Sequence, residues 1–278
     1  MGDVVGVIGL GAMGVPMAAN LERAGYEVAS YDIRGTGSAG SVAEVAARAT
    51  RAVIVVVRTR PQVEAVVAQL ERAGLDVLVM STIDPSTMER LAQDLARRGL
   101  TALDAPVSGG VAGAEAGTLA IMAAGDSAAV ARCRPLLEAV GRSIFVIGDR
   151  PGMGQAVKLA NQLMLAVNLV AAQEGLRLAD EYGLQPENVL PVVERSTGAS
   201  WAAANWETVL GWWRDYQPGG ALDIIVKDLR SLLDDAAERR VPLPVAAVAF
   251  QRLHDVWRVT PAAEGHPRIH DPESYGRN

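Results

Sequence analysis

Three glycines near the start of the chain constrain its fold more than any other feature. They have the spacing Gly9-x-Gly11-x-x-Gly14, follow an apolar run typical of a strand, and precede a helical pattern. A second predicted strand ends at Asp32, 18 residues after Gly14. In such a unit the first glycine permits a tight turn, the second lets the backbone approach a pyrophosphate, and the third lets helix and strand pack closely. The segment therefore predicts a β-α-β unit with a phosphate site at the start of its helix.

The first half of the chain alternates short apolar runs with helical patterns. The run 52–57, AVIVVV, is apolar on both faces, as in a central strand of a parallel sheet that helices cover on both sides. Other strands are predicted at 4–9, 27–31, 77–80, 101–104, 118–123 and 143–146. Helices are predicted at 13–24, 62–73, 85–98 and 128–139. This order predicts an α/β domain with a Rossmann-type, doubly wound sheet.

The pattern changes after the Gly/Pro cluster at 148–154, which resembles a hinge. Beyond it no strand is predicted. Helical spacing recurs at 152–182, 186–196, 201–213, 219–239 and 242–258, and the tail from Pro261 is expected to be loosely ordered. We therefore expect a dinucleotide-binding domain at 1–149 and an all-helical domain for substrate binding and oligomerisation at 150–278.

Composition narrows the function classes. The chain has 278 residues and a net charge of −6, which offers no basic surface for nucleic acid. No uninterrupted apolar run is long enough to span a membrane. Cys133 is the only cysteine, so no internal disulfide is possible and a reducing cytoplasm is the simplest location. The three histidines lie within the last 25 residues without metal-ligand spacing, so no metal site is expected.

The acid at the end of the second strand bears on the choice of cofactor. Asp32 is placed to bind the ribose hydroxyls of NAD and to repel a 2′-phosphate, whereas the nearby Arg34 could accept that phosphate. NAD is expected, with NADP possible. The remaining residues of the glycine-rich turn, Leu10, Ala12 and Met13, are expected to line the cofactor with the glycines.

Lys158 lies within a mostly apolar helical stretch, where burying a lone ammonium is costly unless it is compensated. Alternatively, the aliphatic part of the lysine side chain could extend along the helix so that its ammonium group reaches water. Asn161 and Gln162 stand three and four residues later, on the same predicted face. A lysine that relays a proton needs a pKa lowered from about 10.4, by desolvation or by a second cation such as Lys227. Lys227 could equally form a surface ion pair with Asp228 or Asp223.

A second glycine-rich turn follows the predicted strand at 101–104. Ser108, Gly109 and Gly110 offer a hydroxyl and unobstructed backbone N–H groups, which suit a carboxylate. A tight loop without a ligand is the alternative. Together with a cation and an amide, this turn provides what a small hydroxy acid requires.

Several motifs resemble those of the β-hydroxyacid dehydrogenases, typified by 3-hydroxyisobutyrate dehydrogenase and tartronate semialdehyde reductase. These motifs, in family order and over nearly the whole chain, are 8-IGLGAMGVPMAANL-21, 104-DAPVSGG-110 with 116-AGTL-119, 152-GMGQAVKLANQ-162 and 227-KDL-229. The resemblance implies a Rossmann domain, a helical domain and a site between them. It also implies hydride transfer between nicotinamide and a short β-hydroxy acid or its semialdehyde, and a homodimer or homotetramer.

The resemblance assigns roles by motif. Lys158 resembles the catalytic lysine, Ser108–Gly110 the substrate-carboxylate loop, and Asn161 with Gln162 the amide position that orients substrate. Thr82 resembles the threonine near the nicotinamide, and Lys227 the second lysine, which closes over the cofactor.

The sequence also departs from the family. The connection after Asp32 is short, which raises the question of whether a helix on the adenosine side is trimmed, and 57-VRTRP-61 replaces a frequent Leu-Pro. The four tryptophans within 200–213 are expected in the core or a subunit interface. Rival functions are an imine reductase, a group that generally lacks this lysine, and a non-catalytic cofactor-binding scaffold.

Overall fold

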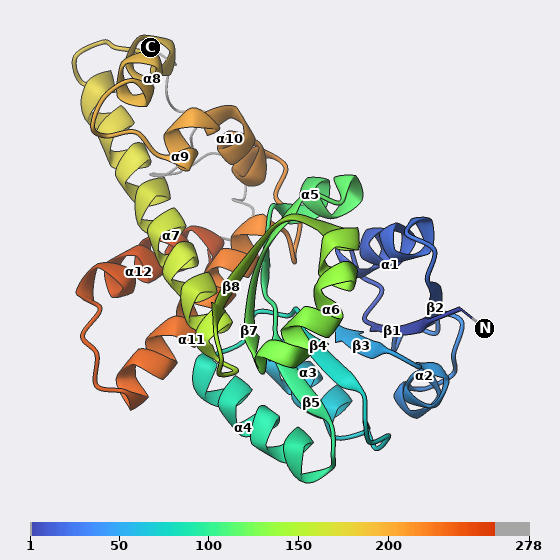
Figure 1. The fold of residues 1–278 in the computed structure, drawn as a ribbon. Helices are drawn as coiled ribbons and strands as arrows, with labels where there is room; N and C mark the ends of the chain where they lie inside the picture. Colours follow the sequence, from blue (N-terminus) through green and yellow to red (C-terminus); the bar gives the residue numbers. More distant parts are fainter. Residues whose placement is uncertain (1, 259–278) are drawn as a thin grey trace. The chain divides into compact units, whose positions relative to one another are not determined.

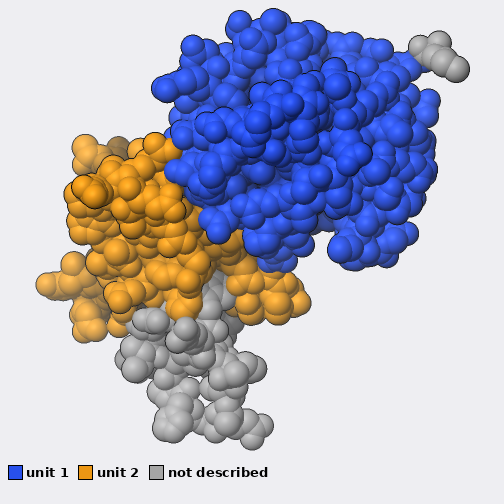
Figure 2. All heavy atoms as spheres, turned by 90° about the horizontal axis from the view of Figure 1, so that it is seen from below, with its two compact units in different colours: residues 1–159 blue, residues 160–278 orange. Residues whose placement is uncertain are grey.

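The computed structural model describes residues 2–258. The chain divides into two compact units, residues 1–159 and residues 160–278 (Figures 1 and 2). This division falls ten residues after the boundary expected from the Gly/Pro cluster, inside a long helix. The fold class is confirmed: a sheet with helices on both faces forms the first unit, and the described part of the second, which ends at residue 258, consists of helices and loops.

The first unit contains one eight-stranded sheet within the described residues, with the order β2-β1-β3-β4-β5-β7-β6 and with β8 paired to β7. Its strands are β1 (Val4–Ile8), β2 (Glu27–Tyr31), β3 (Ala52–Val55), β4 (Asp76–Val79), β5 (Thr101–Asp104), β6 (Val107–Ser108), β7 (Leu119–Gly125) and β8 (Gly141–Gly148). The first five strands are parallel to one another. The glycine-rich turn after β1 and the loops after β3, β4 and β5 therefore leave the sheet at the same edge.

Helices cover both faces of this sheet. They are α1 (Gly14–Arg23), α2 (Val42–Arg48), α3 (Arg60–Val67), α4 (Pro85–Arg97), α5 (Gly110–Ala116) and α6 (Ser127–Val140). Helices α1, α5 and α6 share one buried apolar cluster with the sheet, and α2, α3 and α4 share the other. In β3 the side chains alternate, Ala52 and Ile54 in the first cluster and Val53 and Val55 in the second, which explains why this strand is apolar on both faces.

The structure differs from the sequence prediction at the far end of the sheet. Strand β7 runs antiparallel to β5 and β6, and β8 is parallel to β7. The short strand β6 and helix α5 occupy the connection between β5 and β7, in a segment that was predicted as a loop. Because β6 and α5 connect β5 to β7 at the carboxyl edge of β5, the chain does not cross back to the opposite edge of the sheet, and β7 therefore runs antiparallel to β5.

Helix α3 is shorter than predicted and ends at Val67 rather than near Ala73. Arg98 donates hydrogen bonds to the carbonyl oxygens of Val67 at 3.0 Å and Leu70 at 2.9 Å, so a side chain takes over the acceptors that further helical turns would have used. Helix α4 begins where its residues predict, because Asp84 accepts a hydrogen bond from the Thr87 N–H at 2.7 Å and Pro85 follows the cap.

From Met153 to Arg258 the described chain consists of helices and the loops between them, as predicted. Its helices are α7 (Met153–Asp180), α8 (Pro186–Glu194), α9 (Trp201–Ala204), α10 (Trp206–Arg214), α11 (Ala221–Glu238) and α12 (Pro244–Arg258). The single helix predicted at 201–213 is divided at Asn205. Trp206 is buried in the core of the second unit, and Trp201 is half exposed and stacks on Trp212 at 5.7 Å between ring centres. The tail beyond Pro261 lies outside the described residues.

Candidate active site

The glycine-rich turn between β1 and α1 has the geometry that its spacing predicts. Gly9 has φ +100°, and a Cβ there would lie 2.6 Å from the carbonyl oxygen of Val56. A Cβ on Gly14 would collide with the carbonyl oxygen of Gly9. At Gly11 no protein atom lies within 4 Å of the Cβ position, so its backbone faces open space. The turn therefore fits a pyrophosphate beside Gly11, with Gly9 and Gly14 required by the turn itself.

Asp32, at the carboxyl end of β2, is joined to this turn. Its Oδ2 accepts a hydrogen bond from the Leu10 N–H at 2.8 Å, and its Oδ1 lies 2.8 Å from Nε of Arg34. The Arg34 guanidinium also donates to the Leu10 carbonyl oxygen at 2.7 Å. Mainly through the hydrogen bond from Arg34, the pKa of the buried Asp32 carboxyl is held well below its ordinary range. The carboxylate and the guanidinium thus stand together where the adenosine ribose of a dinucleotide would lie.

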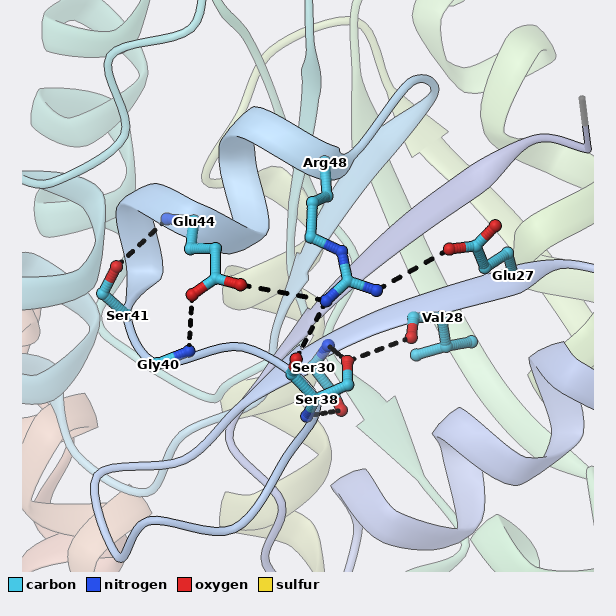
Figure 3. A network of polar contacts seen from close by, with 8 residues as sticks. All are labelled: Glu27, Val28, Ser30, Ser38, Gly40, Ser41, Glu44 and Arg48. Carbon is cyan, nitrogen blue, oxygen red and sulfur yellow. Dashed lines mark hydrogen bonds and ion pairs between the residues drawn. The ribbon is translucent and has the colours of Figure 1, made fainter.

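The short connection after Asp32 retains a helix, α2, and is held by its own polar contacts (Figure 3). Arg48 of α2 donates to the Ser38 carbonyl oxygen at 2.9 Å and lies 3.6 Å from the Glu27 carboxylate. Glu44 accepts from the Gly40 N–H at 2.8 Å, and the Ser41 hydroxyl caps the helix. The adenosine-side helix is therefore present but only seven residues long.

Thr82 lies half-buried in the loop after β4, and a buried glutamine holds the residues on both sides of it. The Ile83 N–H donates to Oε1 of Gln155 at 3.1 Å, and Nε2 of Gln155 donates to the Ser81 carbonyl oxygen at 3.0 Å. Gln155 has no exposed surface. It belongs to the first turn of α7, so this helix is attached to the Thr82 loop.

The carboxylate-binding turn predicted at 108–110 lies where β6 passes into α5. Gly109 has φ +125° and Gly110 has φ +62°, conformations that favour glycine, and both are exposed. Ser108, in β6, is partly exposed and pairs with Ala120 of β7. The turn is consequently an accessible segment whose backbone conformation depends on its two glycines.

The start of α7 packs tightly against the ends of two strands. A Cβ on Gly154 would collide with the Met122 carbonyl oxygen and lie 2.9 Å from Oδ2 of Asp104. That oxygen accepts a hydrogen bond from the Gln155 N–H at 2.8 Å. Asp104 is fully buried, and burial raises the pKa of its carboxyl to about 7 although backbone N–H groups at the start of α7 oppose the rise.

Lys158 stands three residues after Gln155 on α7 and is buried, with 7% of its surface exposed. The sequence placed Asn161 and Gln162 on the same face, but only Gln162 is buried; Asn161 is exposed. The two amide side chains, which the sequence predicted on one helix face, therefore differ in burial.

In the second unit, Asp228 of α11 joins two of the predicted residues. Its Oδ2 accepts a hydrogen bond from Nε2 of Gln162 at 2.7 Å, and its Oδ1 lies 2.6 Å from Nζ of Lys227. Asp228 has no exposed surface, whereas the Lys227 side chain is 27% exposed. The ion pair that the sequence left open as an alternative for Lys227 is therefore present, but its carboxylate is buried rather than at the surface.

Comparisons with known proteins bear on the family. Residues 4–148 match the NAD-binding domain of 6-phosphogluconate dehydrogenase, and residues 152–270 match the NAD-binding domain of NADP-dependent 3-hydroxyisobutyrate dehydrogenase. The chain is 36% identical to 2-(hydroxymethyl)glutarate dehydrogenase of Eubacterium barkeri over 89% of its length and 87% of the relative. It is also 36% identical to NAD-dependent L-serine dehydrogenase of Pseudomonas aeruginosa, over 90% and 91% of the two chains.

The chain belongs to the β-hydroxyacid dehydrogenase family. The structure of Mycobacterium tuberculosis 3-hydroxyisobutyrate dehydrogenase with L-serine agrees, with a TM-score of 0.83, 30% identity, and coverage of 92% of this chain and 94% of that one. This β-hydroxyacid dehydrogenase is accordingly an oxidoreductase that uses a nicotinamide dinucleotide. An imine reductase of Streptomyces aurantiacus shares the fold at a TM-score of 0.65 but only 21% identity.

The sequence assigned no role to two polar residues that are hydrogen-bonded beside predicted site residues, Asp104 and Gln155, and gave Asp228 only as a possible surface ion-pair partner of Lys227. Signals in the sequence pointed to Gln155 and Asp228. Gln155 precedes Lys158 by three residues and so shares its helix face, and Asp228 follows Lys227 directly. Both stand next to apolar positions of a helical pattern, where a polar side chain that becomes buried needs a hydrogen-bond partner.

Two broader features concern the described residues, 2–258. Within this range no helix combines the length and apolar character needed to cross a membrane. Nor do three or more acidic, histidine or cysteine side chains gather there as metal ligands would. Of the three histidines only His254 falls in this range.

Proposed function

We propose that this enzyme transfers a hydride between nicotinamide and the hydroxyl carbon of a short β-hydroxy acid or its semialdehyde, with Lys158 as general acid and base. The observation that carries the proposal is the burial of Lys158 one helical turn after Gln155, whose side chain holds the loop of Thr82. An amine at this place is shielded from bulk water and attached through the helix to the loop proposed to face the nicotinamide.

The composition of the chain supports an amine at this position. Only two of its 26 basic residues are lysines, Lys158 and Lys227, and the other 24 are arginines. A guanidinium is charged throughout the physiological range, whereas an amine can gain and lose a proton. Both lysines stand at positions proposed for the site, and at position 158 the proposed proton transfer would require an amine.

The chemistry follows from this placement. When bound, a nicotinamide ring accepts a hydride from the substrate carbon or returns it. In the oxidative direction the Lys158 amine accepts the hydroxyl proton as the C–H bond breaks and the carbonyl forms. In the reductive direction the Lys158 ammonium donates that proton to the carbonyl oxygen. The backbone N–H groups and hydroxyl of Ser108–Gly110 hold the substrate carboxylate, and Asn161 and Gln162 orient the hydroxyl.

We further propose NAD as the main cofactor, with NADP possible. The residues that would hold it are Gly9 to Gly14, Asp32, Arg34, Thr82 and Lys227. Asp32 supports NAD, because its ionised carboxyl is matched to ribose hydroxyls, and a related L-serine dehydrogenase is described as NAD-dependent. Arg34 supports the use of NADP, because its guanidinium lies at the same end of β2.

The substrate class is proposed from the relatives. They are described as acting on 2-(hydroxymethyl)glutarate, L-serine or 3-hydroxyisobutyrate, each a carboxylic acid with a hydroxyl on the β carbon, one carbon beyond the carbon that bears the carboxyl group. A domain boundary at residues 149 and 150, a homodimer or homotetramer, and a cytoplasmic location also remain proposals. The buried Cys133 thiol suits a reducing compartment.

The experiment that tests this function follows NADH and NADPH absorbance with these acids, their semialdehydes and a panel of imines. We expect Lys158→Ala to lower kcat by about 100-fold or more, and Lys158→Arg to do the same, because charge without proton exchange does not suffice. NADH affinity, measured by fluorescence, should change little. Arg177→Ala, which removes an exposed cation from the same helix, is the matched control.

Near-normal turnover in Lys158→Ala would overturn the proposed role of this lysine. Turnover of imines but of no hydroxy acid would favour an imine reductase, and binding of NADH without turnover of any compound would favour a scaffold.

A further inference from the structure

A chain of hydrogen bonds links the carboxyl ends of three adjacent parallel strands to α7. After β3, the Val57 N–H donates to Oγ of Ser81 at 2.9 Å. After β4, the Ser81 carbonyl oxygen accepts from Nε2 of Gln155 at 3.0 Å. At the end of β5, Oδ2 of Asp104 accepts from the Gln155 N–H at 2.8 Å. Gln155 is the member of this chain that belongs to the helix, and it contacts two of the three strand ends directly.

The two side-chain bonds of Gln155 fix the loop on both sides of Thr82. Ser81 and Ile83 are its partners, and one bond uses the amide as donor and the other as acceptor. The amide therefore cannot rotate by half a turn without losing both bonds. Because Gln155 is fully buried, water does not replace a lost partner at low cost.

This arrangement bears on Lys158, which follows Gln155 by three residues on the same helix. One turn of α-helix is rigid, so the bonds of Gln155 fix the Lys158 backbone relative to the Thr82 loop. Gly154 permits this close approach, since a side chain there would collide with Met122 and crowd Asp104. A leucine at position 155 would fill the same space without specifying the position of the helix.

We propose that Gln155 is a positioning residue that sets the location of the Lys158 amine relative to Thr82, and so aligns proton transfer with hydride transfer. The inference rests on the proposed function, because it assigns the acid–base step to Lys158 and the nicotinamide contact to Thr82. Gln155 itself touches neither reacting atom. Its effect on the reaction passes through the geometry of the two segments that it joins.

The first test is Gln155→Leu. We expect kcat to fall by about 10- to 100-fold, since a misplacement of about 1 Å can cost that much. The NADH dissociation constant, measured by fluorescence, should change less than about 3-fold. The primary isotope effect on kcat with 4-deuterated NADH should rise, because hydride transfer becomes slower relative to product release. A merely structural role would not change the isotope effect.

The second test is Gln155→Glu. An ionised glutamate accepts from Ile83 but cannot donate to Ser81, whereas a protonated glutamate makes both bonds. The ratio of kcat for this variant to kcat for the wild type should therefore rise as pH falls from 8 to 6. Gln155→Leu should show no such recovery, because the leucine does not titrate and the neighbouring Asp104 carboxyl is common to the variant and the wild type.

Asp76→Asn provides the matched control. It weakens the ion pair between the buried Asp76 carboxylate and the exposed Arg132 at the amino end of β4, the edge of the sheet opposite the Ser81–Ile83 loop, so it should lower thermal stability without changing the isotope effect. Wild-type kcat and isotope effect in a folded Gln155→Leu, together with an inactive Lys158→Ala, would overturn this inference alone. Normal turnover in Lys158→Ala would instead overturn the proposed function. If Gln155→Leu fails to fold, an unchanged kcat ratio for Gln155→Glu from pH 8 to 6 would overturn the inference.

Discussion

Asp104 makes a quantitative prediction about stability, because its carboxyl is fully buried beneath the start of α7. Burial raises its pKa from 3.8 to about 7. A carboxyl with a raised pKa in the folded state contributes stability that is fully present below its unfolded pKa and is lost as pH rises through its folded pKa. The wild type should therefore lose stability between pH 4 and pH 8 through this group.

The magnitude follows from the two pKa values. Each pKa unit corresponds to about 1.4 kcal/mol, so the whole difference is worth about 4 kcal/mol. Over the accessible range from pH 5 to pH 8, the linkage relation gives a loss of about 2–3 kcal/mol. In Asp104→Asn no proton is exchanged at this position, and the amide oxygen can still accept from the Gln155 N–H. The variant should therefore lack this loss.

The assay is urea-induced unfolding of the wild type and Asp104→Asn at pH 5, 6, 7 and 8. Every other titrating group is common to both proteins, so the difference between their unfolding free energies isolates Asp104. This difference should shift in favour of the variant by about 2–3 kcal/mol from pH 5 to pH 8. A difference that stays constant across this range would show that Asp104 titrates at an ordinary carboxyl pKa, and would refute the reasoning from burial.

Two further predictions concern the cofactor and the start of α7. Arg34→Ala removes the guanidinium beside Asp32. We therefore expect the ratio of kcat/KM for NADPH to kcat/KM for NADH to fall by about 10-fold. An unchanged ratio would show that Arg34 does not affect the choice of cofactor. Gly154→Ala introduces a Cβ that collides with the Met122 carbonyl oxygen and should destabilise the protein by about 1–3 kcal/mol in urea unfolding. The matched change is Gly175→Ala on the same helix, where an added Cβ would meet no neighbouring atom within 4 Å. It should stabilise the protein by about 1 kcal/mol, and equal effects of the two changes would contradict the packing argument.

The sequence predicted those parts of the fold that depend on local patterns. The two-faced apolar run at Ala52–Val55 and the glycine spacing of the first turn each have one physical explanation, and the structure contains both. The end of α3 could not be predicted in this way. It depends on Arg98, which is 31 residues away from Val67 in the sequence and caps its carbonyl oxygen. Strand β6 has two residues, too few for any periodicity.

The candidate site shows the same division between local pattern and tertiary contact. Motifs identified residues that would face a ligand, such as Lys158 and Ser108, because the chemistry of a ligand restricts residue type. They assigned no role to Asp104 or Gln155 and did not pair Asp228 with Gln162, because the partners of these side chains are backbone and amide groups elsewhere in the fold. A backbone N–H or carbonyl group is present at nearly every position, so the sequence does not reveal which one a buried side chain will meet.

The position of these hidden partners has a physical cause. Parallel strands end at one edge of the sheet with backbone groups that no neighbouring strand satisfies, and in this chain β4 ends at Val79 and is followed by the loop Ser81–Ile83, which is hydrogen-bonded to the start of α7. A helix that begins there presents unpaired N–H groups of its own. Gln155 and Asp104 satisfy both sets at once, which requires the helix to enter at a fixed place. The polar contacts that complete the fold at this edge thus also set the place of Lys158, so the proposed chemistry needs no separate scaffold.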